Sequence, residues 1–108
     1  MNPIPELSIN EAKERLDAGE TLFVDIRDAD SYQEAHIPGA IHVTNDNVFD
    51  FLDSTDKASP IVVYCYKGNS SLGGTAFFLE QGFQDVQSML GGFDMWRLSY
   101  EYDSGNGA

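Results

Sequence analysis

The sequence predicts a single α/β domain built around a mostly parallel sheet. Short apolar runs typical of buried strands alternate with helical patterns, and the connections between them are short. A chain of 108 residues, 42% of them hydrophobic, can bury a core without disulfides or metal. We therefore expect a sheet with helices on both faces, which is how parallel strands are normally covered.

The expected elements follow one another along the chain. The segments predicted as strands are residues 7–9, 21–24, 40–43, 61–64 and 85–89. Helices are predicted over residues 11–18 and 48–52 and in a short segment that ends at Ala35, with Asn10 capping the first of them and Asp30 or Ser31 the segment before Ala35. A longer helix is predicted from the loop 68–71 to Gln81-Gly82, and a last one that carries Met95, Trp96 and Leu98. The polar, glycine-rich residues 103–108 are predicted to form a flexible tail, so the domain is assigned to residues 1–102.

Charge and cysteine content narrow the classes of function. A net charge of −12 and an isoelectric point near 4.1 argue against nucleic acid or an anionic membrane as a partner. The single cysteine cannot form an internal disulfide, and the first residues lack the charge and hydropathy of a signal peptide. We therefore expect a cytoplasmic protein. The two histidines and one cysteine show no zinc-binding spacing, so no metal is predicted.

Cys65 lies where the predicted strand 61–64 gives way to the start of a helix. Gly68-Asn69-Ser70-Ser71 combines a glycine that can take positive φ with side chains that cap helices. The free N–H groups and partial positive charge of a helix start stabilise a thiolate, which is the nucleophilic form of cysteine. No acidic residue lies between Asp56 and Glu80. A lone cysteine is more often a small core residue, but this setting favours a reactive thiol.

Three polar clusters follow predicted strands, at residues 25–27, 65–70 and 90–92. In parallel sheets, ligands bind beyond the carboxyl ends of the strands. We expect the three clusters to share one edge of the sheet.

Four segments, in this order and spacing, resemble the signatures of the rhodanese family. They are Val24-Asp25-Ile26-Arg27, His36-Ile37-Pro38-Gly39-Ala40-Ile41, the loop Cys65 to Ser70, and Gly91-Gly92-Phe93 with Trp96. The resemblance spans nearly the whole chain and points to the small single-domain thiosulfate sulfurtransferases of bacteria. It implies a single rhodanese-like domain with a five-stranded parallel sheet, and a cysteine that cycles between free thiol and persulfide.

The resemblance also implies a reaction. Cys65 would take the outer sulfur of thiosulfate, release sulfite, and pass the sulfur from a persulfide to cyanide or a thiol acceptor, with no other cofactor. Backbone N–H groups of the loop would cradle the persulfide, Lys67 would attract the sulfonate, and Ser70 and Ser71 could donate hydrogen bonds to it. The predicted cradle consists of Tyr66, Lys67, Gly68, Asn69, Ser70 and Ser71.

Other residues of these four segments are assigned supporting roles. Arg27 is expected to brace the loop through an ion pair with Asp25 or Asp28, although a contact with the anion is the alternative. His36 is expected to stabilise the turn before Pro38. Phe93 and Trp96 are expected in the core, and Gly91-Gly92 in a tight turn near the loop.

Two features depart from the common pattern of the family. Tyr66 stands where many members have arginine, so positive potential depends on Lys67 and the backbone dipoles, and we expect weaker thiosulfate binding. The two-domain members bury the site between their halves. Without a second half, Cys65 is expected to be comparatively open, which suits a protein acceptor.

Competing functions differ in how well the loop fits them. A cysteine phosphatase or arsenate reductase needs a longer loop that ends in arginine, and residues 66–74 contain none. In a Walker motif the lysine follows a glycine that is missing upstream of Lys67, which excludes nucleotide binding of that type. A persulfide relay or docking module that serves a partner protein such as thioredoxin stays open as the alternative.

Overall fold

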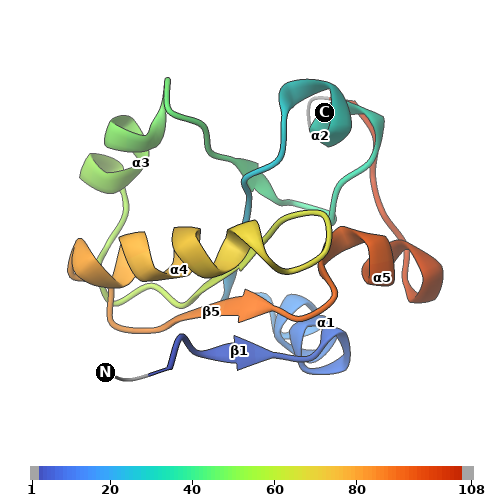
Figure 1. Cartoon of the computed structure of the whole chain (residues 1–108), viewed down its shortest axis with the longest axis horizontal. Helices are drawn as coiled ribbons and strands as arrows, with labels where there is room; N and C mark the ends of the chain where they lie inside the picture. Colours follow the sequence, from blue (N-terminus) through green and yellow to red (C-terminus); the bar gives the residue numbers. More distant parts are fainter. Residues whose placement is uncertain (1–2, 106–108) are drawn as a thin grey trace.

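The computed structural model describes residues 3–105 and contains one parallel sheet (Figure 1). Its strands, listed along the chain, are β1 (Glu6–Leu7), β2 (Leu22–Asp25), β3 (Ile41–His42), β4 (Ile61–Tyr64) and β5 (Val86–Met89). They form a 5-stranded sheet in the order β1-β5-β4-β2-β3, and every pairing of these strands is parallel. The α/β fold with a five-stranded parallel sheet is therefore confirmed.

Helices cover both faces of this sheet, as predicted. They are α1 (Ile9–Ala18), α2 (Ala29–Glu34), α3 (Val48–Ser54), α4 (Ser70–Glu80) and α5 (Gly92–Ser99). On one face, Ala12 of α1 and Phe93 and Trp96 of α5 pack in a buried cluster with Met89 of β5. On the other, α3 and α4 supply the side chains that meet Val86 of β5 and Val63 of β4. The alternating strand residues therefore divide between two cores.

Two helix starts differ from the prediction. Helix α1 is capped by Ser8 and not by Asn10, because Ser8 Oγ accepts a hydrogen bond from Glu11 N while the Glu11 carboxylate accepts one from Ser8 N. The capping box starts the helix at Ile9 and shortens the predicted strand. Helix α2 is capped by Asp28, whose carboxylate accepts from Ser31 N, and not by Asp30 or Ser31.

The predicted tail at residues 103–108 lies partly within the described chain. Asp103 exchanges backbone hydrogen bonds with His36, and Gly105 N donates to the carbonyl oxygen of Gln33. Residues 106–108 lie outside the described residues, so the predicted flexibility of the tail is untested. Among residues 3–105, no helix has the length and apolar character needed to cross a membrane.

Candidate active site

The site begins at the carboxyl end of the central strand β4. All of its residues, from Ile61 to Tyr64, are buried, since the strand lies between β2 and β5 and is covered on both faces. Cys65 follows directly and is only 3% exposed, so the expectation of a comparatively open cysteine is wrong, because its own loop surrounds the sulfur. The buried strand thus fixes the position of the sulfur at the start of the loop that leads to α4.

Helix α5 fixes the direction of the loop. The first N–H groups of a helix have no partner within it. Here Phe93 N donates to the carbonyl oxygen of Cys65 and Asp94 N to that of Tyr66, each at 2.9 Å. Because these two carbonyls turn toward α5, the N–H groups that follow are free to turn toward the sulfur. Figure 1 shows this loop passing beside the start of α5.

Two glycines allow the loop to approach its neighbours closely. A Cβ on Gly92 would lie 2.5 Å from the carbonyl carbon and oxygen of Tyr66, and its φ is +58°. A Cβ on Gly68, with φ at +96°, would lie 3.1 Å from Gly91 N. Both positions favour glycine by backbone conformation and by space. The expected tight turn at Gly91-Gly92 near the loop is confirmed.

The sulfur of Cys65 lies in a cradle of hydrogen-bond donors. Gly68 N and Ser71 N donate to Sγ at 3.2 and 3.3 Å, and the thiol donates to Ser71 Oγ at 3.4 Å. When the thiol loses its proton, the Ser71 hydroxyl can become the donor to the thiolate. Burial raises the pKa of the Cys65 thiol, but hydrogen bonds from Ser71, Gly68 and Lys67 outweigh that effect and hold the pKa below its ordinary value. The arrangement favours the thiolate, the form in which cysteine is a nucleophile.

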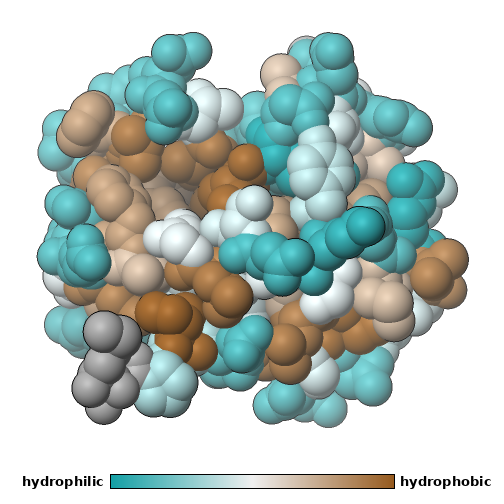
Figure 2. Space-filling model, viewed as in Figure 1, coloured by the Kyte–Doolittle hydropathy of each residue, from teal (hydrophilic) through white to brown (hydrophobic). Residues whose placement is uncertain are grey.

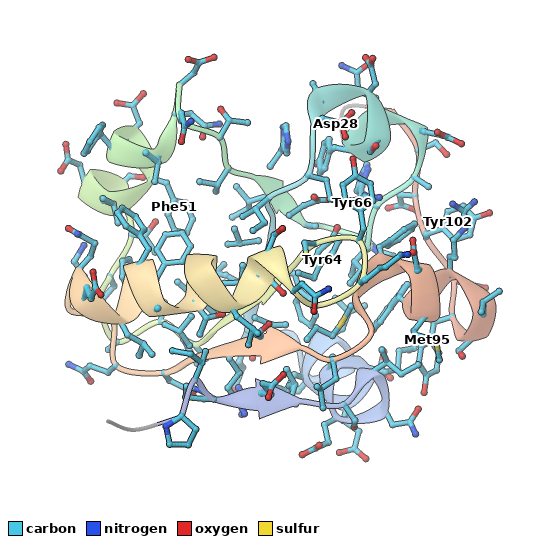
Figure 3. The ribbon with its side chains drawn as sticks, in the orientation of Figure 1. Asp28, Phe51, Tyr64, Tyr66, Met95 and Tyr102 are labelled. Carbon is cyan, nitrogen blue, oxygen red and sulfur yellow. The ribbon has the colours of Figure 1, made fainter. Side chains whose placement is uncertain are left out.

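Tyr66 forms the outer wall of the loop and is tied to the start of α2. Its hydroxyl hydrogen-bonds to the Asp28 carboxylate and lies 2.8 Å from Ser31 Oγ. Figure 3 shows the Tyr66 side chain pointing from the loop toward Asp28. Its ring lies 5.6 Å from the Arg27 guanidinium. Tyr66 thus tethers the loop to α2.

The remaining predicted cradle residues present their side chains differently. Lys67, Asn69 and Ser70 are exposed, while Ser71 is fully buried. Asn69 caps α4 by position but makes no side-chain capping bond. Only Ser71 therefore brings a side chain to the sulfur, and the attraction of an anion by Lys67 stays a prediction.

Arg27 and Asp25 form a buried ion pair beside the loop. Arg27 Nη2 donates to Asp25 Oδ2 at 2.7 Å and to the Ala35 carbonyl oxygen, and the guanidinium carbon lies 4.4 Å from the Phe93 ring centre. Burial alone would lower the pKa of Arg27, but the hydrogen bonds and charge of Asp25 raise it above the ordinary value. The predicted partner Asp25 is the one used, and the bracing of the loop by this pair stays a prediction.

His36 lies in the segment after α2, fully buried. Its Nδ1 lies 2.7 Å from the Tyr32 carbonyl oxygen, its ring stacks on the Tyr32 ring, and its backbone pairs with Asp103. These contacts join α2 to the C-terminal segment across the turn before Pro38. The role in that turn remains a proposal that the contacts support.

The three polar clusters meet at one edge of the sheet, as expected. Gly92 of the third cluster touches Tyr66 of the second, and Arg27 of the first lies against Phe93. Two pockets of about 720 and 950 Å³ lie elsewhere among the described residues, and neither is lined by Cys65. The first, between α3 and α4, is the brown hollow of Figure 2.

Sequence reasoning missed two parts of the site. Ser88 of β5 is fully buried and its Oγ lies 2.7 Å from Ser71 Oγ. Its signal was a polar residue on the same face of a buried strand as Val86, since such a side chain needs a partner. The contacts of Asp28 and Ser31 with Tyr66 had no local signal, because they join segments far apart in sequence.

The fold and the site define a class: an α/β domain whose cysteine thiolate lies in a cradle of N–H groups at the end of a central strand. The model of the family described as Rhodanese-like domain matches residues 8–99. The chain therefore belongs to the rhodanese family.

Similar proteins agree with this assignment. The chain is 49% identical over 84 residues, 78% of its length and 76% of the relative's, to thiosulfate sulfurtransferase GlpE of Pseudomonas paraeruginosa. A crystal structure of the BH2092 protein of Bacillus halodurans is 28% identical, with a TM-score of 0.79 over 96% of this chain and 81% of that one. A human single-domain sulfurtransferase, 18% identical, shares the fold with a TM-score of 0.80 over 90% of this chain and 98% of that one.

Proposed function

We propose that the protein is a thiosulfate sulfurtransferase that carries sulfur as a persulfide on Cys65. One observation carries the proposal: Cys65 Sγ accepts hydrogen bonds from Gly68 N and Ser71 N in a loop whose carbonyls are held by α5. A cradle of this kind stabilises negative charge on sulfur before and after transfer. The identity to a protein named thiosulfate sulfurtransferase supports the choice of donor.

The first half-reaction loads the cysteine. The Cys65 thiolate attacks the outer sulfur of thiosulfate, a new S–S bond forms, and the bond to the sulfonate sulfur breaks. Sulfite leaves as a dianion with the electron pair of that bond, and the outer sulfur keeps the negative charge that it had in thiosulfate and becomes the charged end of the persulfide. Gly68 N, Ser71 N and the Ser71 hydroxyl stabilise the attacking thiolate. Exposed Lys67 would attract the dianion to the loop.

The second half-reaction returns the thiolate. A nucleophile attacks the outer sulfur, the S–S bond breaks, and its electron pair returns to Cys65 Sγ. With cyanide the product is thiocyanate, and with a thiol it is a persulfide of the acceptor. This scheme requires no cofactor, because the protein carries the sulfur on its own cysteine.

The acceptor in the cell is the less defined part of the proposal. The sulfur itself is only 3% exposed, but the loop around it presents four exposed residues that a protein acceptor can meet: Tyr66, Lys67, Asn69 and Ser70. A reduced dithiol protein such as thioredoxin is a reasonable acceptor on this ground, and the single cysteine fits a reducing, cytoplasmic setting.

The test compares acceptors and removes the nucleophile. The wild-type protein should form thiocyanate from thiosulfate and cyanide, and Cys65→Ser should abolish this activity with an unchanged circular-dichroism spectrum. Thiosulfate kinetics are then compared with sulfur transfer to reduced thioredoxin. Thiocyanate formation by Cys65→Ser at the wild-type rate would refute the proposal, whereas transfer only from a protein persulfide would favour the relay.

A further inference from the structure

Two buried hydroxyl groups, of Ser88 and Ser71, form a hydrogen-bonded series that leads to the sulfur of Cys65. Ser88 Oγ lies 2.7 Å from Ser71 Oγ, which lies 3.4 Å from Cys65 Sγ. Ser71 and Ser88 have no exposed surface. Water therefore does not reach either hydroxyl from outside, and each must find its partners within the protein.

The position of Ser88 is set by the sheet. Strand β5 lies between β1 and β4, where Ser88 pairs with Glu6 on one side and Val63 on the other. Its backbone N–H also donates to the carbonyl oxygen of Pro5. A residue held on both sides cannot shift easily, so its hydroxyl is a fixed point under the start of α4.

The number of hydroxyl hydrogens decides the direction of the hydrogen bonds between Ser88, Ser71 and Cys65. A serine hydroxyl has one hydrogen to donate and can accept two. Within residues 3–105, the Ser88 hydroxyl has Ser71 Oγ as its one side-chain partner. If Ser88 donates to Ser71, the Ser71 hydrogen is free to point at the sulfur. In the reverse direction the Ser88 hydrogen is buried without an acceptor, and the Ser71 hydrogen points away from the sulfur.

We propose that Ser88 is a positioning residue for the thiolate: its hydroxyl donates to Ser71 Oγ and thereby turns the single Ser71 hydrogen toward Cys65 Sγ. No proton is transferred between the sulfur and the two serine hydroxyls. The thiol proton leaves to solvent, and both serines keep their hydrogens. Only when Cys65 is a thiolate does every hydrogen in the series Ser88, Ser71 and Cys65 have an acceptor. The two hydroxyl groups therefore favour the charged form of the sulfur.

This inference deepens the proposed function and rests on it for its role in catalysis. The thiolate itself can be measured without sulfur transfer, from the pH dependence of alkylation by iodoacetamide, because Cys65 is the only cysteine in the chain. A failure of sulfur transfer in the wild type would refute the proposed function, yet it would leave the alkylation result intact. The two proposals can therefore fail separately.

The main variant is Ser88→Ala. We expect it to raise the alkylation pKa of Cys65 by about half a unit to one unit, the size of a lost hydrogen bond. Ser88→Thr keeps the hydroxyl and should restore most of the shift. Thr75→Val is the matched control: it removes a buried hydroxyl that bonds to the Ser71 carbonyl oxygen and not to the chain of hydroxyls, so the pKa should stay unchanged.

A double variant tests the path through Ser71. In a Ser71→Ala background, Ser88→Ala should cause no further shift, because the hydroxyl that it orients is gone. An unchanged pKa in Ser88→Ala would overturn the proposal. A shift of the same size in the Ser71→Ala background would overturn it too, because Ser88 would then act on the sulfur by another route.

Discussion

The two faces of the sheet contribute differently to the loop around Cys65. From the α4 side, Gly68 N, Ser71 N and the Ser71 hydroxyl contact the sulfur itself. From the α5 side, the N–H groups of Phe93 and Asp94 end on backbone carbonyls of the loop. The α4 side sets the reactivity of the thiol, and the α5 side holds the backbone of the loop. Substitutions on the two sides should therefore separate thiol reactivity from stability.

The largest loss of stability is expected from Arg27→Ala, at a residue that lies against Phe93 on the α5 side. It leaves the Asp25 carboxylate buried without its partner, and stability should fall by about 3–5 kcal/mol in urea unfolding. Arg15→Ala, which breaks a more exposed pair with Asp85, is the control and should cost about 1 kcal/mol or less. If Arg27→Ala weakened thiosulfate binding without loss of stability, Arg27 would be a substrate contact and not a brace.

The second-largest loss of stability is expected from Gly92→Ala. Its Cβ would lie 2.5 Å from the Tyr66 carbonyl, and its backbone has φ of +58°. We expect a loss of about 2–5 kcal/mol, from left-handed strain and overpacking together. Gly39→Ala has a similar φ of +77° but nothing within 4 Å of its Cβ, so it measures strain alone. Equal losses in both variants would mean that the contact with the loop contributes little.

On the α4 side, Ser71→Ala should lower stability by about 1–3 kcal/mol, because the buried Ser88 hydroxyl loses its partner. It should also raise the Cys65 pKa by about 1–2 units, the size of the effect of a hydrogen bond to a charged group. Hydrogen bonds lower this pKa in the wild type, so their loss must raise it. Alkylation should slow by about 10–100-fold below the wild-type pKa and reach the same rate at high pH. A lower rate at high pH as well would indicate a displaced sulfur.

The smallest effect is expected at the rim of the loop. Lys67 is exposed, so Lys67→Ala should raise KM for thiosulfate by about two- to fivefold with little change in kcat. The difference should shrink as salt is added. Lys13→Ala removes the same charge from α1 and serves as the control. A fall in kcat with an unchanged KM would show that Lys67 acts on the reaction and not on binding.

The order of the elements could be predicted because short apolar runs and helical patterns alternate along the chain. Strand β4 was predicted with its observed bounds, since every residue from Ile61 to Tyr64 is apolar or aromatic and buried. Helix starts were less certain. Several polar residues near α1 could cap it, and the reciprocal bonds of Ser8 and Glu11 decided the choice.

The site was predictable as far as it is local. Cys65 between a buried strand and a helix start indicated a thiolate in a cradle of N–H groups. The bonds of Ser88 and of Tyr66 with Asp28 were not predictable in this way. They join residues 17 and 38 positions apart, and their geometry follows from how α4 and α2 pack on the sheet.

The central claim is that Cys65 carries sulfur as a persulfide. The most direct measurement is the intact mass of the protein after incubation with thiosulfate, and again after addition of cyanide, with Cys65→Ser as control. We expect the gain of one sulfur atom in the wild type only, its removal by cyanide, and the appearance of thiocyanate. No gain of mass on a thiol that still alkylates readily would contradict thiosulfate as the donor.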